Sequence, residues 1–367
     1  MKKIVLVALL LSAIAINCNT AKACTAAVVA AKASKEGGSI LWKNRDSGYH
    51  RTCIRYFESE KYAYLGVANI KNSEPRVFAG VNEVGFGIVN TATLNLPKNK
   101  EVKGTRDRPT FMSKALAQCS TVDEFEEFVR NYKRGYKFTT NVGVGDAKGH
   151  AAFFEIWGDG YRRYDVDKTE SGVDFRSSFS FAGDMSKSER CRRRYNAMVE
   201  QTAGKKKFSA EDFYNYARSY YVAGKGDALK YDEPLSSIPR ETVPFRSTVG
   251  SFSIVCGEHP RMLVSMGYPA ACPAIPVWVE AKSAIPKCLS GSASHDLGRR
   301  FIEKAYTKVA NKHYHLNKPL VREALKVKTK LPFPEKMPKD IEKFNRKADQ
   351  KFYRHQQRID ALLVETR

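Results

Sequence analysis

The N-terminus of this chain has the three-part pattern of a secretion signal. Two lysines after Met1 precede an apolar run over Ile4–Ile16, and an Ala-Lys-Ala triplet of small residues ends at position 23. A signal peptidase cuts after this basic, apolar, Ala-x-Ala order. We therefore expect residues 1–23 to be removed as a signal peptide, which makes Cys24 the first residue of the mature chain.

A cysteine in that position carries two reactive groups, a thiol and a free α-amino group. The amine has an ordinary pKa of about 7.7–8.0, so near neutral pH it can accept the proton of the thiol. One residue can then supply both nucleophile and base, which is the arrangement of N-terminal-nucleophile (Ntn) hydrolases. Two other interpretations stay open: Cys24 begins a structural disulfide, or it carries the lipid of a lipoprotein. Lipoproteins usually have leucine where Ala21 stands, and Cys18, the other candidate for lipid attachment, follows Asn17 rather than a small residue.

Length and composition allow one large domain or two. The chain has 367 residues, of which 43% are hydrophobic, and a domain takes about 150 residues. Beyond the signal, no apolar run approaches the roughly 20 residues of a membrane helix, so we expect a soluble body. A short signal with two lysines is typical of bacteria, which predicts a periplasmic or secreted protein.

The cysteines permit disulfides without choosing among them. There are eight, at positions 18, 24, 53, 119, 191, 256, 272 and 288. If Cys18 leaves with the signal and Cys24 stays free, six remain, and six cysteines allow 15 pairings. Buried free thiols are equally compatible with a domain of this size. Cys256 and His259 have a C-x-x-H spacing, but no second ligand pair matches it, so we expect no zinc site.

The chain is strongly basic, especially toward its end. Its formal net charge is +23, and +20 remains after loss of the three lysines in the signal. Residues 299–367 hold 19 Lys and Arg against eight Asp and Glu. Secretion removes the usual nucleic-acid partner and no motif of a nucleic-acid reader is present, so we expect no nucleic-acid binding. Contact with anionic envelope polymers and oligomer formation stay open.

The order of strand and helix patterns predicts an α+β fold with a largely antiparallel sheet. Strands are expected at residues 25–30, 39–42, 62–69, 76–79, 86–91, 141–146, 151–157, 251–256 and 261–265. Helices are expected at residues 110–118 and after capping boxes at residues 121–124 and 209–212. Strands, then helices, then strands, with few βαβ repeats, are typical of α+β proteins. From residue 293 to 367 the chain is basic, poor in strand patterns and interrupted by prolines, which predicts a mostly helical extension beyond a catalytic domain of residues 24–292.

Four motifs follow one another in an order that resembles a known group of enzymes. They are Cys24-Thr25, Asn44-Arg45-Asp46, the glycine-rich run of residues 80–87 and the Asp-Ala-x-Gly hairpin within residues 141–155. The order resembles the choloylglycine hydrolase and penicillin V acylase group, and more closely peptidase family C45, the acyl-CoA:6-aminopenicillanic acid acyltransferase-like family. The resemblance covers roughly residues 24–280. It implies an Ntn-hydrolase αββα sandwich that needs neither metal nor organic cofactor.

The resemblance also implies roles for particular residues. Asp46 would hold the α-ammonium group of Cys24, and the side-chain amide of Asn82 would stabilise the oxyanion. Lys43 stands where bile-salt hydrolases carry an arginine beside the nucleophile, and Arg45, on the same face of the strand, ranks second. Arg190 matches the arginine of a later Ser-Arg motif, although the asparagine of the family's preceding Thr-Asn pair is absent.

Each of these assignments has an ordinary structural alternative. Asp46 could be a turn carboxylate at a strand end, and Asn82 a turn asparagine before Gly85. Arg190 could be a surface residue at the start of a helix.

The function expected from these observations is cleavage of a linear amide in a small molecule, through a thioester on Cys24. N-acyl amino acids, peptides and β-lactam side chains are the candidate substrate types. An acyltransferase would use the same acyl-enzyme, and a basic envelope-binding lipoprotein without enzymatic activity is the alternative from a different class.

Overall fold

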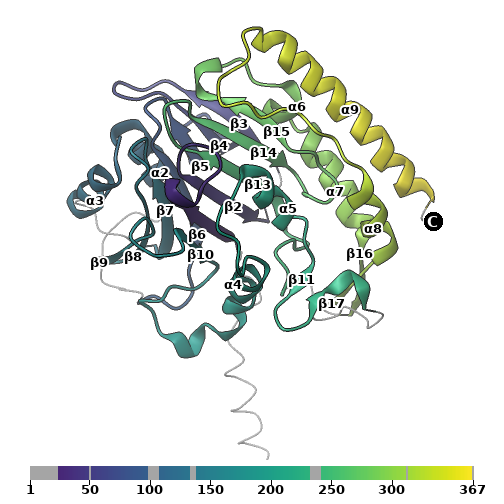
Figure 1. Cartoon of the computed structure of the whole chain (residues 1–367). Coiled ribbons are helices and arrows are strands. Elements are labelled where there is room, and N and C mark those ends of the chain that lie inside the picture. The colour runs from purple at the N-terminus through teal and green to yellow at the C-terminus, as the bar shows by residue number, and fades with distance from the viewer. Residues whose placement is uncertain are drawn as a thin grey trace, which may run out of the picture.

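The computed structural model describes residues 24–48, 51–97, 107–132, 138–231, 241–310 and 313–365, so the expected signal segment lies outside it. Within these residues two antiparallel sheets pack face to face, and helices cover both outer faces (Figure 1). The α+β prediction and the four-layer αββα arrangement are thereby confirmed.

The first sheet contains the strands that carry the expected nucleophile and its neighbours. Its strand order is β10-β1-β2-β13-β14-β15. The bounds are β1 Thr25–Val29, β2 Ile40–Asp46, β10 Val173–Arg176, β13 Thr248–Val255, β14 Arg261–Met266 and β15 Ile275–Trp278. The predicted hairpin of β1 and β2 forms with Thr25 opposite Asn44. Both strands are buried throughout because the sheet is covered on both faces.

The second sheet is a meander in which every strand pairs with the next one along the chain. Its strands are β3 Thr52–Phe57, β4 Tyr64–Asn69, β5 Val77–Asn82, β6 Gly87–Ala92, β7 Thr140–Gly145, β8 Ala151–Trp157 and β9 Gly160–Asp165. The two sheets approach closely at Gly143, where a Cβ atom would lie 2.6 Å from Cγ2 of Val28. A glycine is needed there because the opposing side chain occupies the space of a Cβ.

Helices α2, Arg108–Gln118, and α3, Val122–Asn131, cover the second sheet, while α4, Glu189–Gln201, and α5, Ala210–Tyr216, cover the first. Thr121 caps α3 through the Glu124 backbone N–H, and Ser209 and Asp212 form the predicted capping box of α5. Short elements complete this part: β11 Tyr221–Val222, β12 Gly226–Asp227, and 3-10 turns at Ala31–Ala33, Met185–Lys187, Ala228–Lys230 and Val279–Ala281.

The C-terminal part packs along one side of the sandwich (Figure 1). It comprises α6 Lys287–Ser290, α7 Ala293–Ala305, β16 Tyr306–Ala310, β17 His313–Leu316, α8 Lys318–Lys326 and α9 Ile341–Glu365. The β16–β17 hairpin was not expected from its weak strand pattern. Phe301 of α7 and Phe352 of α9 belong to the same apolar cluster as Phe252 of β13, so the extension shares the core of the sandwich. No helix among the described residues is long and apolar enough to cross a membrane.

Candidate active site

Cys24 lies directly before β1, at the end of the hairpin where β2 finishes. Its side chain is enclosed, with the residue 7% exposed, and Sγ lies 3.8 Å from the backbone oxygen of Asp46. When the β1–β2 register is continued by one residue, Cys24 stands opposite Arg45. The hairpin therefore brings the Asn-Arg-Asp triplet back beside the cysteine.

Lys43 and Arg45 leave β2 toward the second sheet, which confirms that strand alternation puts them on one face. Lys43 Nζ donates to the backbone oxygen of Asn90, at 2.5 Å, and to its Oδ1, at 2.6 Å. The Arg45 guanidinium lies over the ring of Phe78, 4.0 Å from the centroid. Asn90 is on β6 and Phe78 on β5, and they come opposite each other when the β5–β6 register is continued by one residue.

Three buried cations, Lys43, Arg45 and Arg108, interact electrostatically with Cys24. Burial lowers the pKa of Lys43 from 10.5 to about 8, and attraction to Cys24 opposes that shift while repulsion from Arg45 and Arg108 adds to it. Burial likewise lowers the pKa of Arg45 to about 10 and lowers that of Arg108, again with opposition from Cys24. Reactive cysteines are found in such electropositive, partly enclosed surroundings. Arg108 was missed because a single arginine at the first residue of a helix gives no sequence signal.

Asp46 presents its carboxylate to the opposite side of β2, toward α4. Oδ2 accepts from Nη1 of Arg194 at 2.5 Å, and Oδ1 accepts from the Thr248 hydroxyl at 2.6 Å and from the Asn44 amide at 3.4 Å. Burial raises the pKa of Asp46, and Arg194 and Thr248 counteract the rise. The carboxylate is thus anchored inside the protein and is not a turn residue at the surface.

The structure does not bring Asn82 to the cysteine, and its expected oxyanion role is corrected here. Its amide nitrogen donates to the backbone oxygens of Leu116 and Cys119, at 2.9 and 2.8 Å, and its Oδ1 accepts from the backbone N–H of Phe86 at 2.8 Å. Both amide hydrogens therefore form hydrogen bonds with the C-terminal end of α2. The residue also lies four positions along β5 from Phe78, or about 13 Å at the usual strand rise.

Asn90 is the asparagine that lies beside Lys43. It is 8% exposed, and among the described residues its amide nitrogen donates only a long hydrogen bond, 3.3 Å, to the Thr140 hydroxyl. The β5–β6 hairpin explains why Asn90 and not Asn82 lies near Lys43 and Arg45. Asn82 is at the turn of the hairpin, whereas Phe78 and Asn90 are at the opposite end, where Arg45 and Lys43 contact them. The sequence signal that could have identified Asn90 is a polar residue inside the apolar strand that follows the Asn82 turn.

The remaining predicted residue, Arg190, is the second residue of α4, and its side chain lies outside the described part of the structure. The α4 cation that reaches Asp46 is Arg194, one turn further on. Another buried asparagine, Asn141 of β7, holds the segment that follows β10. Its amide donates to the backbone oxygens of Ser177, at 3.3 Å, and Phe179, at 2.8 Å.

The cysteines within the described residues are all free thiols, so none of the permitted disulfides is formed there. His259, the C-x-x-H histidine, pairs with Glu280 at 2.9 Å. In the same residues no cluster of His, Cys, Asp or Glu could hold a metal ion.

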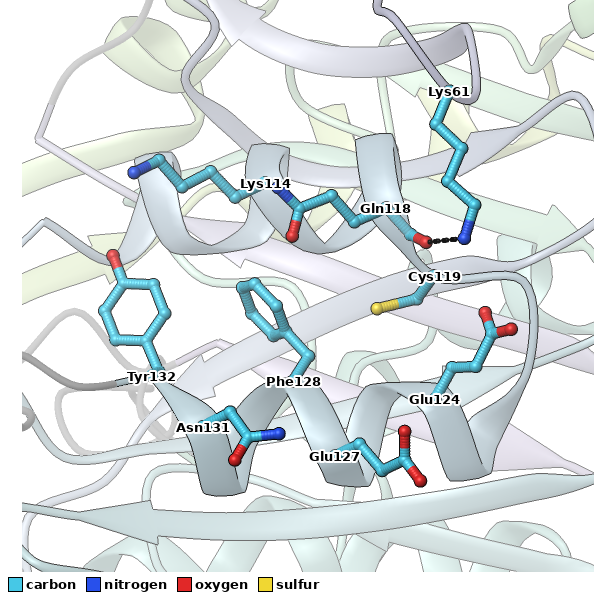
Figure 2. Close-up of a pocket in the computed structure, with 9 residues that line it drawn as sticks. All are labelled: Lys61, Lys114, Gln118, Cys119, Glu124, Glu127, Phe128, Asn131 and Tyr132. Atoms are coloured by element: carbon cyan, nitrogen blue, oxygen red, sulfur yellow. Dashed lines mark hydrogen bonds between the residues drawn. The ribbon is translucent and has the colours of Figure 1, made fainter.

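A hollow of about 630 Å³ opens elsewhere, between α2 and α3 on the outer face of the second sheet (Figure 2). It is lined by Lys61, Lys114, Gln118, Cys119, Glu124, Glu127, Phe128, Asn131 and Tyr132. Burial raises the pKa of its cysteine, Cys119, to about 12, so this sulfur stays a thiol near neutral pH. The hollow therefore offers no thiolate nucleophile.

Comparisons with known proteins find similarity at low sequence identity, among solved structures only. The sequence matches no protein-family model and no curated protein. Among solved structures, a variant of the conjugated bile acid hydrolase from Clostridium perfringens is 15% identical, with 70% of this chain and 93% of that chain covered and a TM-score of 0.41. A Caenorhabditis elegans ortholog of N-acylethanolamine-hydrolyzing acid amidase is 15% identical over 63% of this chain and 92% of that one, with a TM-score of 0.43. Penicillin V acylase from Agrobacterium tumefaciens is 13% identical over 70% and 86%, with a TM-score of 0.42.

Proposed function

We propose that the mature protein is an Ntn cysteine amidohydrolase that cleaves a linear amide in a small molecule, in the periplasm or outside the cell. The observation that carries the proposal is the placement of Cys24. The residue expected to become the N-terminus lies at the end of the β1–β2 hairpin, where it interacts electrostatically with Lys43, Arg45 and Arg108 and its sulfur lies 3.8 Å from the backbone oxygen of Asp46.

The proposed reaction runs through a thioester. The sulfur of Cys24 attacks the amide carbonyl, and the free α-amine of the same residue takes the thiol proton. The amine product then leaves with that proton, and water hydrolyses the thioester. The backbone oxygen of Asp46 lies 3.8 Å from the Cys24 sulfur, and we assign the carboxylate of the same residue, fixed by Arg194 and Thr248, to orienting the α-ammonium group.

The tetrahedral intermediate needs hydrogen-bond donors for its oxyanion. Lys43 donates to Asn90 Oδ1 at 2.6 Å and interacts electrostatically with Cys24, so we assign the Lys43 ammonium and the Asn90 amide to that task in place of Asn82. Lys43 needs its charge for it, and a pKa of about 8 leaves it mostly protonated near neutral pH.

The first experiment is to express the full chain with its own signal and determine the intact mass of the secreted protein. A mass that begins at Cys24 with no addition supports the proposal. An added diacylglyceryl group would support the lipoprotein alternative instead.

The same preparation is then screened with N-acyl amino acids, penicillin V, bile-salt conjugates and short peptides. Addition of a second amine to an active reaction separates hydrolysis from acyl transfer, because an acyltransferase would form the new amide. No turnover of any amide by protein with a free Cys24 would reject the proposed function.

A further inference from the structure

Arg45 is a buried cation that the reaction above leaves without a task. The residue is only 4% exposed, and Nη1 of its guanidinium is buried with no hydrogen-bond partner among the described residues. Stacking on Phe78 holds the plane of the group in place. A buried donor without a partner costs about 1–3 kcal/mol, and more when it is charged, so its retention calls for a ligand.

The charges around Cys24 are also out of balance. Lys43, Arg45 and Arg108 all interact electrostatically with Cys24, and a cysteine side chain can carry no more than one negative charge. The nearest carboxylate, that of Asp46, is already paired with Arg194 on the other side of β2. Lys43 is held by both oxygens of Asn90, whereas within the described part of the chain Arg108 makes one long hydrogen bond, 3.4 Å from Nη1 to the backbone oxygen of Thr139.

We propose that Arg45, with Arg108 as the second cation, binds an anionic group of the amide substrate, a carboxylate or a sulfonate. This inference rests on the proposed function, whose substrate class it narrows. A guanidinium suits the task because its donors form a planar fork that matches the two oxygens of a carboxylate.

The position of Arg45 limits where the anion lies on the substrate. Since Arg45 stands opposite Cys24 in the continued β1–β2 register, the anion is within a few bonds of the carbonyl that the sulfur attacks. An N-acyl amino acid places a carboxylate there on the amine side. A monoamide of a short dicarboxylic acid places it there on the acyl side.

Two matched pairs of substrates separate these sources. N-decanoylglycine against N-decanoylglycinamide tests the amine side, and glutaryl p-nitroanilide against butyryl p-nitroanilide tests the acyl side. The variant is Arg45→Gln. The control is Lys114→Gln, which removes one exposed positive charge from the same helix as Arg108, at the distant hollow.

The wild-type enzyme is expected to prefer the charged member of one pair. Arg45→Gln should lower kcat/KM for that member about 10- to 100-fold more than for its neutral partner, with the difference mainly in KM. Lys114→Gln should behave as wild type. Equal losses in kcat on both members would overturn the inference, because Arg45 would then act on the cysteine and not on the substrate.

A binding measurement keeps this inference separate from the proposed function. Calorimetry with N-decanoylglycine and with glutaryl p-nitroanilide is done on Cys24→Ala protein, with and without Arg45→Gln. Binding that needs Arg45, in a protein whose wild type turns over no amide, would support the anion site and reject the hydrolase. Binding of either probe at the same strength without Arg45, or of neither probe at all, would overturn the anion site.

Discussion

The carboxylate of Asp46 and the guanidinium of Arg194 form a buried ion pair, with 2.5 Å between Oδ2 and Nη1. The pair joins the last residue of β2 to α4, and the backbone oxygen of the same aspartate lies 3.8 Å from the Cys24 sulfur. The pair thus connects the outer helix layer to the position of the nucleophile. Because both side chains are buried, removal of either one leaves the other charge uncompensated and lowers the stability of the fold.

We expect Arg194→Met to destabilise the fold by about 3–5 kcal/mol, since it leaves the Asp46 carboxylate buried and uncompensated. The measurement is the free energy of unfolding in urea. Arg193→Met is the matched control in the same helix, because Arg193 is 42% exposed and its ion pairs are with Glu189 and Glu241. An exposed pair contributes at most about 1 kcal/mol. Similar decreases in the free energy of unfolding in the two variants would show that the buried pair stabilises the fold no more than the exposed one.

The pH dependence of the reaction should reflect two groups. The α-amine of Cys24 must be neutral to accept a proton, so kcat/KM should rise as pH passes through its ordinary pKa of about 7.7–8.0. Lys43 should then lose its proton near its pKa of about 8, which removes positive charge from the oxyanion site and lowers kcat/KM. Lys43→Arg keeps the charge, so its alkaline decline should move to higher pH. An unchanged decline in Lys43→Arg would assign it to another group.

The same shift has the opposite effect on stability. Between pH 8 and 10.5 the unfolded chain still holds the Lys43 proton that the folded protein has released. The unfolded state binds more protons in that window, so the contribution of Lys43 to the free energy of unfolding increases with pH there. Lys43→Gln should remove this contribution, and urea unfolding at pH 7.5 and 10 checks it.

Cys24→Ala should abolish turnover while leaving the fold nearly unchanged, because an alanine fills most of the same enclosed space. Cys24→Ser should also lose most of the rate, since a hydroxyl is far less acidic than a thiol. Cys119→Ala is the control that removes a buried thiol away from the proposed site. Wild-type turnover in Cys24→Ala would move the active site elsewhere.

A related test concerns the signal. Protein that is expressed in the cytosol and keeps residues 1–23 has its Cys24 nitrogen in a peptide bond, so it lacks the base and should show little activity. Mass spectrometry must confirm that the segment is still attached. Full activity from the uncleaved chain would rule out the α-amine as the base.

Local pattern was sufficient to predict much of the fold. Alternation within β2 correctly placed Lys43 and Arg45 on one face, and the Ser209–Asp212 spacing predicted a capping box that forms. The weak pattern of β16 and β17 hid a hairpin, because its strands are short and rich in basic residues. Strand alternation and capping boxes depend only on residues a few positions apart, so they can be recognised directly in the sequence.

The sequence predicted only those site residues that lie on the strand paired with the one after Cys24. Asp46 and Lys43 are on β2, whose hairpin with β1 returns them to Cys24. Arg194 comes 148 positions after Asp46 and Arg108 comes 84 positions after Cys24, each from a helix, and only the packing of the layers brings them to these strands. The choice between the two asparagines of the β5–β6 hairpin likewise depended on which end of the hairpin faces the cysteine.

Asn90 and Asn82 provide the final prediction, since the structure gives them separate tasks. Asn90→Ala should lower kcat by about 10²–10³-fold with little change in KM, because its amide would act mainly in the transition state. Asn82→Ala should instead leave the Leu116 and Cys119 carbonyls without their donor. It should destabilise the fold by about 1–3 kcal/mol and preserve kcat in the folded fraction. Kinetics at matched folded concentration and urea unfolding measure both effects. The reverse pattern, with kcat lost in Asn82→Ala and kept in Asn90→Ala, would restore the oxyanion role to Asn82.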